Sequence, residues 1–234
     1  MNWILGIDTS STDLSVGLFR NDEPVASYSR YLRNSHAEHI AQAVTFLLGS
    51  CGVGPGEITH TAVAAGPGSF TGLRIGFAFV KGFCMSGAVR VLPVSSLFVL
   101  AHCASGRAAS AVSAIDARRG EVFWARFSVR GTRVVRETGD TAGTADEFRD
   151  FLKTGDAVVF DTLGYAQSTV FDFLDGRPDV FSARRYLVER GLCCAEAGAA
   201  AVNDKAAWKN AGDALPGYLR SFTSPALPKG AAAG

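Results

Sequence analysis

The feature that most constrains the fold of this chain is an internal repeat of strand patterns. One apolar strand pattern ends at Asp8 and another ends at Asp116, 108 residues later (116 − 8). Each aspartate is followed by a polar turn and an alternating strand pattern. These second patterns end at Phe19 and Phe127, again 108 residues apart (127 − 19). Alternation of apolar and polar residues is typical of half-buried strands. We therefore expect two halves that share one architecture.

The repeat continues into a third strand, a helix and a fourth strand in each half. The further strands are expected at 24–30 and 61–65 in the first half, and at 132–138 and 157–161 in the second. Both helices begin with a capping-box pattern, from Ser35 to Glu38 and from Thr144 to Glu147. In this motif the hydroxyl and the carboxylate each bond a backbone N–H at the helix start. Alternating strands and helices predict α/β layers, with a mixed sheet flanked by helices in each half.

The same pattern predicts the domain organisation. We expect an N-terminal half over residues 1–105 and a C-terminal half over 106–223, joined near the linker 104–107. A final alanine-rich helix at about 187–203 is expected to pack across both halves. Residues 224–234 are rich in alanine, glycine and proline, which predicts a disordered tail.

A glycine-rich run at 66–76 lies between a strand pattern and a long apolar helix pattern. Free N–H groups at the start of a helix can bind an anion, so one interpretation is a nucleotide or anion site. The other is a tight strand-to-helix connection without a ligand. The candidate binding residues are Asp8, Thr9, Ser10, Gly66, Gly68, Ser69 and Thr71.

Duplicated halves with an Asp-Thr-Ser turn after the first strand resemble the actin, Hsp70 and sugar-kinase superfamily. More specifically, the segments 4–10, 66–76, 93–97 and 116–122 resemble the TsaB family, and 217–220 resembles that family's C-terminal Tyr-Leu-Arg. The resemblance implies a non-catalytic accessory subunit in the biosynthesis of threonylcarbamoyladenosine on tRNA. Its implied partners are a TsaD-like catalytic subunit and a TsaE-like ATPase.

The resemblance also bears on catalysis. The catalytic relative binds a metal through two histidines four residues apart, and the similar segment of this chain has Ser96 and Leu100 there. Neither side chain replaces an imidazole ligand. We therefore expect no metal, no catalytic residue and no required cofactor, with weak nucleotide binding left open. The alternative is a stand-alone ATP-dependent phosphotransferase or metallohydrolase. Against it, the second-half turn at 117–120 lacks hydroxyls, and Asp161 to Gly164 is a faint nucleotide-site candidate.

Charge and composition exclude some classes of protein. The net charge of +1 gives no basic field to hold nucleic acid, so tRNA is expected only through the complex. The apolar stretch at 75–89 is interrupted by Lys81 and is too short to span a bilayer. The start of the chain lacks a basic leader, and five cysteines show no metal spacing. These features predict a cytoplasmic protein that does not bind a membrane.

The helix after the glycine-rich run is apolar nearly all round, with Arg74 and Lys81 as its charges. Such a helix must be covered on nearly all sides. We expect it to form an apolar association surface with the helix at about 36–49, used in a homodimer or for the TsaD-like subunit. Alternatively, the second half or the final helix covers it. The candidate interface residues are Ala37, Ile40, Val44, Leu47, Leu73, Phe77, Val80, Lys81 and Cys84.

A second candidate surface is the charge cluster of Arg118, Arg119 and Glu121. One interpretation is a docking patch for a partner subunit or for tRNA phosphate. The other is a solvated hairpin turn with no partner. His36 and His39 share one helix face, and a structural or interface role is favoured for them over metal binding.

Overall fold

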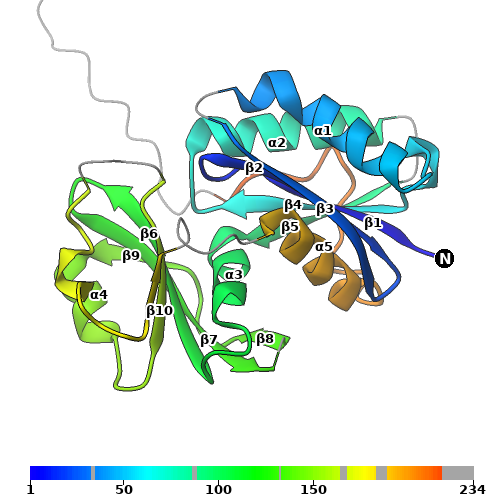
Figure 1. The fold of residues 1–234 in the computed structure, drawn as a ribbon. Helices are drawn as coiled ribbons and strands as arrows, with labels where there is room; N and C mark the ends of the chain where they lie inside the picture. Colours follow the sequence, from blue (N-terminus) through cyan, green and yellow to red (C-terminus); the bar gives the residue numbers. More distant parts are fainter. Residues whose placement is uncertain (33–34, 86–88, 132, 164–167, 183–188, 218–234) are drawn as a thin grey trace, which may run out of the picture.

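The computed structural model describes residues 1–32, 35–85, 89–131, 133–163, 168–182 and 189–217. Two halves stand side by side, each built on one sheet (Figure 1). The predicted tail at 224–234 and the Tyr-Leu-Arg segment at 218–220 lie outside the described residues. None of the helices in these ranges is long and apolar enough to cross a membrane.

The first sheet has five strands in the order β3-β2-β1-β4-β5. They are β1 (Trp3–Asp8), β2 (Asp13–Arg20), β3 (Glu23–Tyr31), β4 (His60–Gly66) and β5 (Arg90–Ser95). The pairs β1–β2 and β2–β3 are antiparallel, and β1–β4 and β4–β5 are parallel. Two helices, α1 (His36–Ser50) and α2 (Phe70–Cys84), cover one face, and α5 (Arg190–Ala201) covers the other (Figure 1).

The second sheet repeats this topology. Its elements are β6 (Ser110–Arg118), β7 (Glu121–Arg130), β8 (Arg133–Arg136), β9 (Thr141–Thr144), α4 (Ala145–Phe151), β10 (Ala157–Asp161) and β11 (Val180–Ser182). The order β8-β7-β6-β10-β11 reproduces that of the first sheet, and β6 is antiparallel to β7 and parallel to β10. The predicted duplicated α/β fold is confirmed. The third strand expected at 132–138 is present as the shorter β8, and a further strand that was not predicted, β9, pairs with the other end of β7.

Alternating side chains divide the second half into two cores. On β6, Ala111 and Ile115 face a cluster that contains Leu97 and Phe127, whereas Val112 and Ala114 face a cluster with α4. The strand is buried along nearly its whole length because apolar residues occupy both of its faces.

The short helix α3 (Ser96–Ala101) joins the two halves. Leu97 and Leu100 lie in the core of the second half, whereas Val99 packs with β4 and α5 of the first. Although α3 falls within the range predicted for the N-terminal half, it belongs to both cores. The described part of the final helix, α5, packs mainly on the first sheet rather than equally on both halves. A Cβ at Gly6 would lie 2.0 Å from the Gly191 carbonyl oxygen, so this contact requires glycine.

Only one of the two predicted capping boxes forms. In α4, Thr144 Oγ1 accepts from the Glu147 N–H at 3.2 Å, and Glu147 Oε2 accepts from the Thr144 N–H at 2.7 Å. In α1, Ser35 makes no side-chain cap hydrogen bond among the described residues. Its carbonyl oxygen lies 2.9 Å from His39 Nδ1 instead. The prediction of a box at Ser35 was therefore wrong. Three 3-10 turns complete the fold, η1 (Pro55–Glu57), η2 (His102–Ala104) and η3 (Asp172–Leu174).

Candidate functional site

The turn after β1 and the glycine-rich loop after β4 contact each other directly. Asp8, Thr9 and Ser10 are fully buried. The Ser69 N–H donates to the Ser10 carbonyl oxygen at 2.7 Å, and Thr9 Oγ1 donates to the Gly72 carbonyl oxygen at 2.8 Å. The structure therefore brings the predicted anion-site residues together, but they use one another as hydrogen-bond partners.

The two segments approach each other most closely at two glycines of the loop. A Cβ at Gly72 would lie 2.0 Å from the Thr9 carbonyl oxygen, and one at Gly68 would lie 2.6 Å from the Ser10 carbonyl oxygen. Ser69 Oγ caps α2 by accepting from the Gly72 N–H at 3.2 Å. This arrangement favours the interpretation of the loop as a tight connection. Ligand binding there stays a prediction.

Three central strands end in the same aspartate turn. The Oδ1 atoms of Asp8, Asp116 and Asp161 each accept from the N–H two residues further on, at 2.6, 2.6 and 2.7 Å. Asp8 ends β1, Asp116 lies near the end of β6, and Asp161 ends β10. The repeat thus brings carboxylates from both halves to the strand ends.

A buried charge cluster joins the two halves at these strand ends. Arg190, at the start of α5 and 3% exposed, donates through Nη2 to Asp161 Oδ2. Asp13 lies near both of them and near Asp8. Its pKa is raised mainly by burial, and further by Asp161 and Asp8, while Arg190 opposes the rise. Burial also lowers the pKa of His36, which faces Asp8 and Asp13. One buried guanidinium therefore lies close to two carboxylates, those of Asp161 and Asp13.

The cluster shows no arrangement for a metal. Within the described ranges, no three His, Cys, Asp or Glu side chains are placed to hold an ion together. Asp8 Oδ2 is buried without a hydrogen-bond partner there. Sequence reasoning missed Asp13 and Arg190. The available signal for Arg190 was a cation at the start of a segment otherwise rich in glycine, cysteine and alanine.

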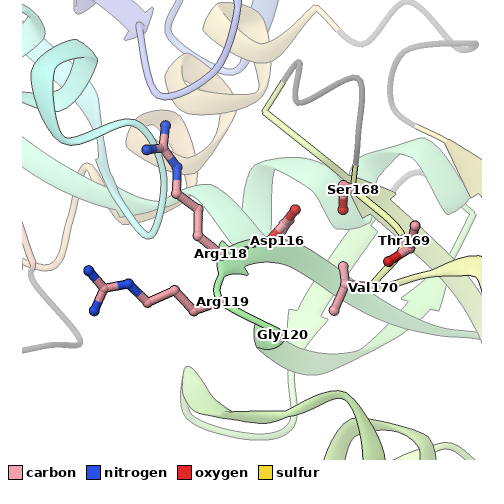
Figure 2. Close-up of a pocket in the computed structure, with 7 residues that line it drawn as sticks. All are labelled: Asp116, Arg118, Arg119, Gly120, Ser168, Thr169 and Val170. Atoms are coloured by element: carbon pink, nitrogen blue, oxygen red, sulfur yellow. Dashed lines mark hydrogen bonds between the residues drawn. The ribbon is translucent and has the colours of Figure 1, made fainter.

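The predicted docking patch lies at the β6–β7 turn. Arg118 and Arg119 are exposed and adopt positive φ values of 66° and 57°. Beside them is a cavity of about 510 Å³ that Asp116, Ser168, Thr169 and Val170 also line. Figure 2 shows Asp116 and Ser168 on one side of the turn, while the two arginine side chains extend away from them. Glu121 pairs with Arg118 in the strand register, so the three predicted residues do cluster.

The positions that correspond to the relative's metal ligands lie in the core. Ser96 and Leu100 are both fully buried in α3, and Leu100 packs with Leu97 and Phe127. No solvent-accessible site exists at either side chain. His102, one turn later, is also largely buried, and burial lowers its pKa to about 4.

The predicted interface residues occupy different places from those expected. Seven of the nine are at most 4% exposed and pack within the first core: Ile40, Val44, Leu47, Leu73, Phe77, Val80 and Cys84. Of the other two, Ala37 is exposed and Lys81 donates to the Gly212 carbonyl oxygen at 3.3 Å. These seven side chains are buried in the single chain because α1 and α2 direct them at the sheet and at each other, and their role in an interface stays a prediction.

The outward faces of α1 and α2 carry other apolar side chains. Phe46 is 62% exposed, and Met85, just after α2, is 86% exposed. Phe79 and Phe83 are partly exposed, with their rings stacked at 5.8 Å between centroids. We call Phe46, Phe79, Phe83 and Met85 the outer stripe; within it the Phe46 ring contacts Tyr28 of β3, with 5.5 Å between the two ring centroids. Their positions were not predicted, because hydrophobic periodicity does not say which face of an all-apolar helix is covered.

Known proteins with this architecture identify the family. A family model described as "TsaD: tRNA N6-adenosine threonylcarbamoyltransferase" matches residues 30–162. The TsaB protein of Bacillus subtilis, named for tRNA threonylcarbamoyladenosine biosynthesis, is 34% identical over 67% of this chain and 68% of its own length. The Escherichia coli TsaB is 36% identical over 53% of this chain and 54% of its own. A solved structure titled "YeaZ from Pseudomonas aeruginosa" has a TM-score of 0.76 and 27% identity, and covers 94% of this chain and all of that one.

The fold and the family-model match define a protein with a TsaD-like domain. Within that class, the chain belongs to the TsaB/YeaZ family of tRNA threonylcarbamoyladenosine biosynthesis proteins.

Proposed function

We propose that this chain is an accessory subunit without catalysis of its own, which binds and supports a TsaD-like catalytic subunit in tRNA threonylcarbamoyladenosine biosynthesis. The observation that carries the proposal is that the aspartate turns of both halves are occupied by contacts within the chain itself. Arg190 neutralises Asp161 where the halves meet, and the glycine-rich loop rests on the Asp-Thr-Ser turn. A reaction there would require both contacts to open.

The outer stripe supports the choice of a protein partner. Exposed apolar side chains that gather on neighbouring helices mark association surfaces more often than isolated ones do. We propose that the TsaD-like subunit covers this stripe, and that the isolated protein covers it by forming a homodimer through the same face. A TsaE-like ATPase completes the proposed assembly, which acts in the cytoplasm.

Nearly balanced charge favours tRNA binding through the complex rather than through this chain alone. We propose that this chain contacts a partner subunit or a tRNA phosphate through Arg118 and Arg119. The alternative of a stand-alone phosphotransferase or metallohydrolase predicts ATP turnover or metal-dependent hydrolysis by the purified protein. We expect neither.

Reconstitution of tRNA threonylcarbamoylation tests the proposal. The TsaD-like and TsaE-like subunits are assayed with and without this chain, and we expect full activity only with it. Phe46→Lys should weaken TsaD binding at least tenfold while leaving the unfolding midpoint unchanged, since Phe46 is largely exposed. Val25→Lys, at another exposed apolar position, on β3, is the matched control and should bind normally. Equal activity without this chain, or ATP turnover by it alone, would refute the proposal.

A further inference from the structure

A second cavity lies where the two halves meet and away from the aspartate turns. Its volume is about 620 Å³, within the range typical of small-molecule sites. Strand β5, helix α3 and helix α5 form one part of its wall, and strand β8 of the second half forms another. The proposed function makes no use of this cavity.

The interior of the cavity is apolar. Leu92, Phe98 and Ala197 line it and belong to one hydrophobic cluster, and Val134 of β8 is 8% exposed. Burial raises the pKa of Glu196 and lowers that of His102 to about 4, so the site disfavours charge of either sign in its depth. A charged group on a ligand would therefore have to stay at the rim.

The charged side chains of the wall differ in their partners. Arg136 pairs with Asp140, and Glu196 Oε2 lies 3.4 Å from His102 Nδ1. Asp204 accepts from the Ala206 N–H at 3.1 Å.

Arg133 is exposed at the rim. Its backbone pairs with Arg130 in the β7–β8 ladder, and its side chain has no hydrogen-bond or ion-pair partner in the part of the chain that the structure describes. Arg133 is therefore the cation at this rim that is open to a ligand. The wall also carries the carboxylates of Glu196, beside a His102 ring that is neutral at pH 7, and of Asp204, so the positive charge is local to Arg133.

We propose that the cavity binds a small amphipathic carboxylate, whose apolar body lies against Leu92, Phe98 and Val134 and whose carboxylate pairs with Arg133. A guanidinium pairs with a carboxylate through two parallel hydrogen bonds, which favours this anion over a neutral polar group. The apolar wall supplies most of the affinity because it removes the alkyl or aryl body from water.

Calorimetric titration of the full chain with hexanoate, octanoate and 1-octanol tests this proposal. Affinity should rise roughly fourfold for each added methylene, from the transfer free energy of a CH₂ group. Octanoate should bind roughly twofold to fivefold more tightly than 1-octanol, the range for an exposed ion pair. Arg133→Gln should remove that difference and leave the affinity for 1-octanol unchanged.

Two variants locate the binding. Ala200→Trp places a large side chain at the cavity from an exposed position on α5, and should abolish binding of both ligands without affecting folding. Phe46→Lys disrupts the outer stripe and should leave both affinities unchanged. The His102 ring-proton resonances should shift on addition of octanoate. Absence of saturable binding, equal affinity of the wild type for octanoate and 1-octanol, or binding that survives Ala200→Trp would overturn the proposal.

Discussion

Replacement of Arg190 by methionine tests whether this residue is the counter-ion that holds the two halves together. Arg190 and Asp161 are 3% and 8% exposed; Asp161 ends β10 of the second sheet, whereas Arg190 begins α5, which packs on the first sheet. Breaking a buried ion pair by removing one partner costs about 3–5 kcal/mol, because the remaining charge is left buried. Asp13 also loses a nearby cation. We therefore expect Arg190→Met to lower the free energy of unfolding by about 3–5 kcal/mol.

Urea unfolding followed by circular dichroism at pH 7 measures this change. The double variant Arg190→Met/Asp161→Asn also removes the carboxylate that Arg190→Met leaves without a partner. It should therefore recover part of the lost unfolding free energy, and the coupling free energy between the two positions should reach up to about 3 kcal/mol. Arg149→Met is the matched control. Arg149 pairs with Asp146 at 3.1 Å on the surface of α4, so its loss should cost less than about 1 kcal/mol. Equal effects of the two single variants would refute the role given to Arg190.

Two further predictions concern the helix after the glycine-rich loop and the pH dependence of stability. Gly72→Ala should lower the free energy of unfolding by about 1–3 kcal/mol, because its Cβ would overpack against the Thr9 carbonyl oxygen. Gly82→Ala has open space around its Cβ and should raise the free energy of unfolding by about 0.5–1 kcal/mol. Similar urea midpoints for the two variants would contradict this prediction. Burial holds the pKa of His102 at about 4, below the ordinary 6.5, so the unfolded chain binds a proton that the folded chain does not. Wild-type stability should therefore fall by up to about 3 kcal/mol as pH drops from 6.5 to 4, and His102→Asn should lose this component. Parallel pH profiles of the two proteins would show the reasoning to be mistaken.

The repeat could be predicted because its signals are local. Alternating side chains and a charged turn define each strand end within a few residues, so Asp8 and Asp116 were placed correctly at equivalent turns. The box at Thr144 formed for the same reason. The equivalent pattern at Ser35 did not form a box, and Ser35 has a ψ of 24° where Thr144 has the extended value of 162°.

The candidate sites were less predictable, because whether a residue is exposed depends on which other segments of the chain pack over it. The apolar residues of α1 and α2 look alike in sequence, yet Val44 is 3% exposed and Phe46 is 62% exposed. Likewise, the glycine-rich run fits an anion loop or a tight connection equally well until the position of Thr9 is known.

By itself, the sequence determined the duplicated halves, the order of strands and helices, and the aspartate turns, because short-range periodicity and turn chemistry specify them. Only the tertiary structure decided that Arg190 reaches Asp161, that the glycine-rich loop closes on Ser10, and that Phe46 rather than Val44 faces outward. Those outcomes depend on burial between segments far apart in the chain, where Gly191 bonds to Ser15 across 176 residues. Burial of that kind arises only when the sheets and helices pack together, so it leaves no local pattern in the sequence.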